Sequence, residues 1–182
     1  GWSPTVPATM GAGGATFTAT WTVNNYTVTW DVDGKTTEES YVYGATIHKP
    51  ADPAKEGYKF IGWATDEKGA TITGLPTEYP AEDTVYNAIF ETINYPVYYY
   101  VLNPADLQFD LVTTGTCEFG EAINPVPASY TVPEGYTLSP AYKDITFTTA
   151  LADGETMPAK RVDLYYKLTV NTYDAIFDAD GG

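Results

Sequence analysis

An internal repeat constrains this chain more than any other feature of its sequence. A tyrosine-led segment begins at Tyr26, Tyr95 and Tyr173, so its copies lie 69 and then 78 residues apart. Three further markers recur in the same order, namely Tyr43-Gly44 with Phe119-Gly120, Glu56-Gly57-Tyr58 with Glu134-Gly135-Tyr136, and Pro80-Ala81 with Pro158-Ala159. Repeats of this kind are supersecondary units that recur along a chain, so we expect tandem modules.

The markers divide the 182 residues into two modules flanked by two partial ones. Gly1-Trp2 matches Gly62-Trp63, so the chain opens late in a repeat. Asp178 to Gly182 follows the third tyrosine-led segment and matches Asp31 to Gly34. We therefore predict the tail of a preceding repeat at 1–23, a first module at 24–92, a diverged second module at 93–171, and the start of a following repeat at 172–182.

Alternation of apolar and polar residues, the pattern of a half-buried strand, runs through much of the chain. The predicted strands include Thr16 to Val23, Tyr26 to Trp30, Leu107 to Leu111, Ile145 to Thr149 and Val162 to Val170. No apolar pattern of helical period extends over ten or more residues, and short helical turns are expected only near Pro53 to Gly57 and Pro104 to Leu107. The sequence therefore predicts a mainly β fold with little helix.

Charge and hydropathy exclude two classes of partner. The chain has 24 acidic and 9 basic side chains and a net charge of -15, whereas a nucleic-acid-binding protein needs a basic surface. No apolar run approaches the 18 residues that cross a bilayer. We expect neither nucleic-acid binding nor membrane insertion.

The groups that could carry catalysis are few and lie apart. Cys117 falls in the second predicted module and the one histidine, His48, in the first, so a nucleophile and base pair is not expected. The acidic pairs Glu38-Glu39 and Glu82-Asp83 fall in predicted loops, which indicates a solvated surface. The Asp31 to Gly34 turn lacks the third ligand and the distal glutamate of a calcium loop, which favours a hairpin turn. We expect no enzymatic activity, metal or cofactor.

Clustered tyrosines are the best candidates for a binding surface. Because neighbouring strand residues face opposite sides, Tyr98 to Tyr100 and Tyr165-Tyr166 place rings on both faces of a sheet. Outward rings, for which Tyr98, Tyr100 and Tyr165 are the candidates, would stack on a sugar or dock a partner. The alternative is packing, because cross-strand aromatic pairs also stabilise small sheets.

The markers resemble the Listeria–Bacteroides repeat, the type of the B-repeat in internalin-like surface proteins. The matching elements are Tyr26 to Gly34, Tyr43-Gly44, Pro50, Pro53, Gly57 to Trp63 and Val85 to Phe90. The resemblance is strong over 24–92 and weaker over 93–171, where Leu138 to Ala141 replaces the Phe-x-Gly-Trp portion. It implies small β-grasp-like modules in tandem, found in extracellular bacterial proteins, and no catalytic residues. Trp63, in the Gly-Trp motif, is expected in the core or between modules.

Two functions follow as expectations. The first is a structural repeat segment of a bacterial cell-surface protein, extracellular and either attached to the cell wall or secreted. It would act as a spacer or display stalk with weak adhesion, and its partners would be neighbouring repeats of the same chain. The alternative is an adhesin module that recognises a host glycoprotein or glycan through exposed tyrosines. A contiguous exposed aromatic patch would favour the second function.

Overall fold

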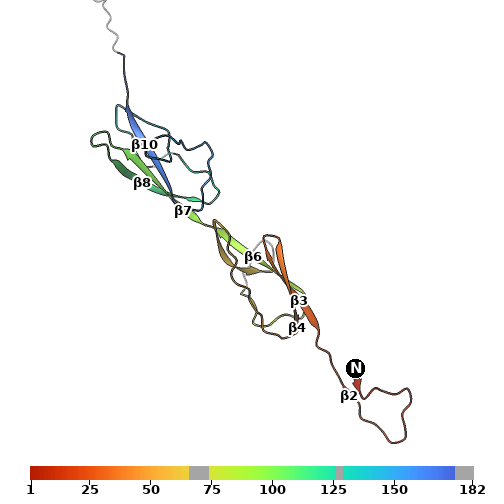
Figure 1. Cartoon of the computed structure of the whole chain (residues 1–182). Coiled ribbons are helices and arrows are strands. Elements are labelled where there is room, and N and C mark those ends of the chain that lie inside the picture. Colours follow the sequence, from red (N-terminus) through yellow and green to blue (C-terminus); the bar gives the residue numbers. More distant parts are fainter. Residues whose placement is uncertain (66–73, 126–128, 175–182) are drawn as a thin grey trace, which may run out of the picture. The chain divides into compact units, whose positions relative to one another are not determined.

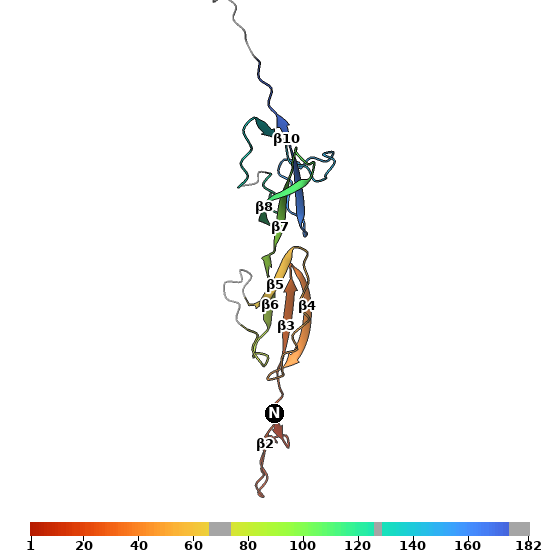
Figure 2. The ribbon, with the colours of Figure 1, turned by 90° about the vertical axis from the view of Figure 1, so that its left-hand side faces the viewer.

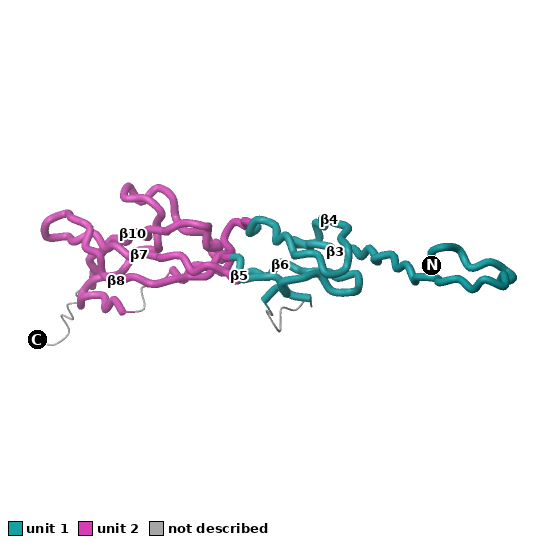
Figure 3. The backbone as a smooth tube through the Cα atoms, turned by 90° about the horizontal axis from the view of Figure 1, so that it is seen from below, with its two compact units in different colours: residues 1–53, 60–90 teal, residues 54–59, 91–182 magenta. Residues whose placement is uncertain are grey.

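The computed structural model describes residues 1–65, 74–125 and 129–174, so most of the segment predicted to start a following repeat lies outside it. The described residues form strands, turns and loops without a helix, which confirms the mainly β fold class. They belong to two compact units, coloured separately in Figure 3. The first comprises Gly1–Pro53 and Phe60–Phe90, and the second Ala54–Lys59 and Glu91–Gly182.

The first unit is built on a four-stranded mixed sheet. Its strands, β3 (Asn25–Val32), β4 (Lys35–Val42), β5 (Tyr58–Ala64) and β6 (Thr84–Thr92), lie in the order β4-β3-β6-β5 (Figure 2). β3 and β4 form an antiparallel hairpin, whereas β3 and β6 are parallel. The hairpin turn has positive φ at Asp33 and Gly34, and the amide of Gly34 donates to Asp31 Oδ1 at 2.7 Å. The predicted hairpin turn is therefore confirmed.

The second unit repeats this strand order. Its strands, β7 (Asn94–Leu102), β8 (Phe109–Glu118), β9 (Tyr136–Leu138) and β10 (Val162–Val170), lie in the order β8-β7-β10-β9. Figure 1 labels β7, β8 and β10. The pairing of Tyr95 with Cys117 matches that of Tyr26 with Tyr41, as the repeat alignment predicts. Loop hydrogen bonds also correspond, since Tyr79 N donates to Ala45 O at 2.9 Å and Met157 N to Glu121 O at 2.8 Å.

Each unit has its own apolar core. The first is made of Val28, Trp30, Tyr41, Trp63, Tyr79 and Tyr86. The second is made of Val97, Tyr99, Val101, Ile123, Ala141, Met157, Leu164 and Tyr166. Trp63 is 4% exposed and packs 4.9 Å from Trp30, between ring centroids, so its predicted place in the core is confirmed. By the repeat alignment Ala141 stands where Trp63 stands in the first unit.

Two predicted strands differ in the structure. Of Thr16 to Val23 only β2 (Thr18–Ala19) is a strand, paired with β1 (Trp2–Ser3), because alternation marks a strand only where a partner supplies hydrogen bonds. Ile145 to Thr149 is a loop, because the side chain of Asp144 accepts the backbone hydrogen bonds that a neighbouring strand would otherwise take.

Three local expectations also need correction. Leu107 and Gln108 precede β8, and Leu107 has a φ of 61° that ends the extended pattern. The segment Pro53 to Gly57 forms no helical turn, because a Lys55–Tyr58 bridge closes a tight turn there. Glu38-Glu39 lies in β4 rather than in a loop, on a strand whose exposed face is rich in acidic and threonine side chains.

Candidate binding surface on the second unit

The three tyrosines predicted to bind a ligand lie together on one face of the sheet. β7 and β10 are parallel neighbours, and their register places Tyr165 beside Tyr100. These two rings stack with centroids 5.3 Å apart, and the ring of Tyr98 lies 6.4 Å from that of Tyr100. Tyr99 and Tyr166 alternate with them and are buried in the core. The three tyrosines are themselves half-buried, so rings pack together and also remain partly accessible.

Three rings that sequence reasoning did not select extend this surface. Phe109 meets Tyr165 edge to face at 5.2 Å, and Phe147 lies 5.9 Å from Phe109. Tyr142 is 5.4 Å from Phe147 and joins the edge of the sheet by bridging to Tyr165. Alternation could have placed Phe109 on this face, whereas the alternation of Ile145 to Thr149 predicted a strand and Phe147 stands in a loop. We call the six rings the aromatic face: Tyr98, Tyr100, Phe109, Tyr142, Phe147 and Tyr165.

A loop held by one carboxylate presents Phe147. The Asp144 carboxylate accepts hydrogen bonds from the amides of Thr146 at 3.0 Å, Thr148 at 3.2 Å and Thr149 at 2.7 Å. The hydroxyl of Thr146 also donates to it and is the main reason that the pKa of Asp144 lies well below its ordinary value. Phe147 has a φ of 57°, a conformation that bulky residues rarely adopt. The loop thus holds a strained backbone in place beside the aromatic face.

Cations border the aromatic face. The guanidinium of Arg161 lies 4.5 Å from the ring centroid of Tyr98 and bonds Asp163 at 2.8 Å, which raises the pKa of Arg161. Lys167 Nζ lies 5.3 Å from the ring centroid of Phe147. A hollow of about 450 Å³ opens beside Tyr165, and its lining includes Lys143, Lys160 and Arg161. Four of the nine cations of this acidic chain therefore lie here.

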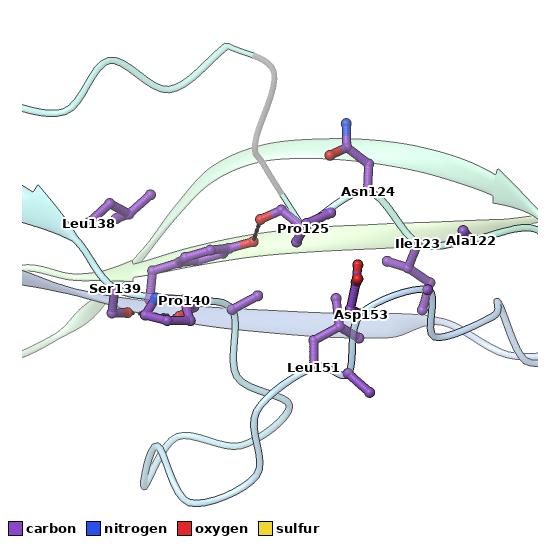
Figure 4. A pocket seen from close by; sticks show the side chains of 13 residues that line it. Ala122, Ile123, Asn124, Pro125, Leu138, Ser139, Pro140, Leu151 and Asp153 are labelled. Carbon is purple, nitrogen blue, oxygen red and sulfur yellow. Dashed lines mark hydrogen bonds between the residues drawn. The ribbon is translucent and has the colours of Figure 1, made fainter.

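A second hollow, of about 660 Å³, enters the core of the same unit (Figure 4). Its lining is largely apolar and includes Ile123, Leu138, Pro140 and Leu151. The hydroxyl of Tyr166 donates to the carbonyl of Pro125, and burial raises the pKa of Tyr166. Ala141 also lines this hollow, whereas Trp63 at the matching place lines a hollow of only about 350 Å³ in the first unit. The site suits an apolar group and contains no nucleophile and base pair.

Cys117 and His48, which the sequence places in different modules, belong to different compact units of the structure. Cys117 is half-buried on β8, and burial, followed by the charges of Glu121 and Glu118, raises the pKa of its thiol. His48 is exposed and belongs to the first unit. In the described ranges no three His, Cys, Asp or Glu side chains gather to hold a metal ion. The absence of enzymatic activity stays a prediction.

Comparison with known proteins identifies one family. Residues 26–88 match the family model of the Listeria–Bacteroides repeat domain. Internalin H of Listeria monocytogenes is 40% identical over 82 residues, which cover 44% of this chain and 15% of that protein.

Two proteins of Evansella cellulosilytica match over nearly the whole chain. One, named "Putative membrane protein", is 28% identical over 168 residues, which cover 91% of this chain and 24% of that protein. The other, named "Putative Gly-rich membrane protein", is 28% identical over 176 residues, which cover 95% and 19% respectively. The chain thus spans less than a quarter of the length of these relatives. Within the described ranges there is no helix of the length and apolarity that a bilayer crossing requires.

Proposed function

Since residues 26–88 are a Listeria–Bacteroides repeat, we propose that this chain is a structural segment of a bacterial cell-surface protein that spaces or displays other domains. The observation that carries the proposal is the repeated strand order, with a separate core in each unit. Modules that each bury their own core can be added along a chain without changing one another's fold. The partners of this segment are then neighbouring repeats of the same chain.

The finer parts of the proposal have separate support. A β-grasp-like module agrees with a mixed sheet in which a hairpin is followed by a strand parallel to its first member. A location on the bacterial surface, attached or secreted, agrees with the family of the repeat and with the printed names of the relatives. The acidic exposed face of β4 would also keep strand edges from pairing between molecules.

Replacement of the segment in its native protein tests the spacer function. A peptide tag placed before residue 1 would be probed with an antibody on intact cells. Deletion of residues 24–171 should reduce antibody access, and an unrelated pair of β modules of the same length should restore it. If the replacement reaches the surface in equal amount, by cell fractionation, and the tag stays inaccessible, the spacer proposal is wrong.

The aromatic face favours a second candidate, an adhesin module for a host glycoprotein or glycan. At the places of Tyr98, Tyr100 and Tyr165 the first unit has the polar residues Thr29, Asp31 and Asn87. Half-buried rings bordered by cations offer a ligand both apolar contact and hydrogen-bond donors.

Matched variants on the two units test this candidate. Tyr100→Thr with Tyr165→Thr gives the second unit the polar character of the first, and Thr29→Ala is the control. Saturable micromolar binding to immobilised host glycoproteins or glycans should weaken at least tenfold, about 1.4 kcal/mol, in the tyrosine variant only. Binding that is absent in the unaltered chain, or equal in all three proteins, would leave the spacer as the function.

A further inference from the structure

The Glu56-Gly57-Tyr58 turn, with the first two residues of β5, belongs to the second compact unit. The turn packs on Phe119, the aromatic residue that follows the β7–β8 hairpin. The rings of Tyr58 and Phe119 meet edge to face with centroids 5.6 Å apart. Gly57 has a φ of 78°, and a Cβ added there would overlap the ring of Phe119. Both the backbone conformation and the ring therefore require glycine.

Two hydrogen bonds connect this turn to the aromatic residue through Ile93. The amide of Ile93 donates to the carbonyl of Gly57 at 2.9 Å, and the amide of Phe119 donates to the carbonyl of Ile93 at 3.0 Å. We call this pair of bonds, together with the ring packed on the glycine, the joint. One complete joint is present in the described part of the chain.

One half of a second joint lies at the far end of the second unit. The amide of Asn171 donates to the carbonyl of Gly135 at 2.8 Å, as Ile93 does to Gly57. Gly135 has a φ of 82°, but a Cβ added there would meet nothing within 4 Å. The turn is therefore formed in the same way as the Gly57 turn, and no ring of the described residues packs on its glycine.

The other half of a joint lies in the first unit. Tyr43 follows the hairpin as Phe119 does, and each precedes a glycine of positive φ, Gly44 or Gly120. The amide of Tyr43 donates to the carbonyl of Asn24 at 3.2 Å, which reproduces the bond from Phe119 to Ile93. Tyr43 is 61% exposed, and within the described ranges no Gly-Tyr turn covers it.

We propose that Tyr43 and the Gly135 turn are docking surfaces for other repeats of the same kind. Tyr43 receives the Gly-Tyr turn of a preceding repeat, and the Gly135 turn receives the aromatic ring that follows the hairpin of the next repeat. This inference rests on the proposed tandem arrangement, and the complete joint at Gly57 defines the chemistry of the partner. A repeat that continues the array thus needs Phe or Tyr, followed by Gly, directly after its hairpin.

Paired glycine variants test the joint in the chain as it exists. Gly57→Ala and Gly135→Ala place a side chain at nearly the same φ, so both carry the same backbone strain. Only Gly57→Ala meets a ring, and it should lower the melting temperature of the second unit clearly more than Gly135→Ala does. Equal losses would show that the ring contact does not restrict the turn and would overturn the proposal.

A duplicated chain tests whether another repeat occupies Tyr43 and the Gly135 turn. Joining Val170 directly to Asn24 of a second copy gives the new link the spacing of the existing one. The ring of Tyr43 should then be buried in the second copy and remain exposed in the first, as it is in the single chain. Tyr43→Ala should lower the melting temperature when placed in the second copy and leave it unchanged in the first.

Two results would overturn the proposal that neighbouring repeats occupy these two surfaces. One is an equal effect of Tyr43→Ala on the melting temperature in the two copies. The other is protection of Tyr43 in the unduplicated chain that rises with concentration, which would make a second molecule the occupant. Neither result depends on antibody access to the tag, so failure of the joint is distinguishable from failure of the spacer function.

Discussion

The two units share one strand order but fill it with different side chains. In the first, Trp30 packs on Trp63, and Tyr41 stacks on Tyr79 at 3.9 Å. The residues at the same four places in the second unit are Tyr99, Ala141, Cys117 and Met157. The strand pattern and the loop hydrogen bonds are kept while the core identities change, so the fold depends on where apolar residues recur rather than on which ones they are.

On the outer faces of the two sheets the second unit has the aromatic residues, whereas in the cores the first unit has more of them. The first unit has threonine, aspartate and asparagine where the second has the tyrosines of the aromatic face. The second unit thus has fewer rings in its core and more on its surface, together with a larger hollow. The proposed adhesin function therefore depends on the second unit, whereas the proposed spacer function depends on both.

Trp63→Ala should have the largest effect, because it gives the first unit the residue that the second has at that place. Loss of a buried tryptophan costs about 3–5 kcal/mol of unfolding free energy. All four tryptophans lie in the first unit, so urea unfolding followed by indole fluorescence reports that unit, and circular dichroism reports both. The second transition should stay unchanged. A loss below about 1 kcal/mol would mean that the units tolerate the same core after all.

Tyr166→Phe should have a smaller effect, confined to the second unit. It removes only the hydroxyl that donates to the carbonyl of Pro125, at a cost of about 0.5–1.5 kcal/mol. Tyr165→Phe is the control on the outer face and should change the free energy of unfolding by less than about 0.5 kcal/mol. Equal losses from both variants would contradict the division between a core face and an outer face.

The sequence predicted the fold class and half of the aromatic face for the same reason. Strict alternation in Tyr98 to Tyr100 and Val162 to Val170 fixes which side chains share a face, because the period of a strand is two residues. It failed for Phe147, because the alternation of Ile145 to Thr149 is also compatible with a loop. The side chain of Asp144 decides between them by bonding the amides that a strand would offer to a neighbour.

The variant Asp144→Asn tests whether the Asp144 carboxylate holds this loop, through the pH dependence of the melting temperature. The pKa of Asp144 is lower in the folded chain than its ordinary 3.8, so its contribution to stability is present above about pH 4 and is lost as the pH falls towards the folded pKa. The variant should melt at a lower temperature than the unaltered chain at pH 7. That difference in melting temperature should shrink at pH 2–3, because the unaltered chain has by then lost part of the stability that the ionised Asp144 carboxylate contributes. A difference that does not change with pH would assign the loss to packing of the loop.

The smallest effects on stability are expected from two surface ion pairs, one in each unit. Lys49 and Asp52 lie 2.5 Å apart with side chains 48% and 62% exposed, so Lys49→Met should change the free energy of unfolding by at most about 0.5 kcal/mol. Lys143 meets both oxygens of Glu155, at 2.9 and 3.0 Å, and Glu155 also accepts from the amide of Ala152.

The second pair should therefore be worth more, up to about 1 kcal/mol, because its carboxylate is already oriented and less entropy is lost on pairing. Methionine keeps the apolar stem, so the two variants compare charge and hydrogen bonds rather than packing. Measured at low and at 1 M salt, where screening acts over about 3 Å, the Lys143→Met loss should shrink less than that of an exposed pair. A larger loss from Lys49→Met than from Lys143→Met would show that the prior orientation of the carboxylate does not determine the strength of these pairs.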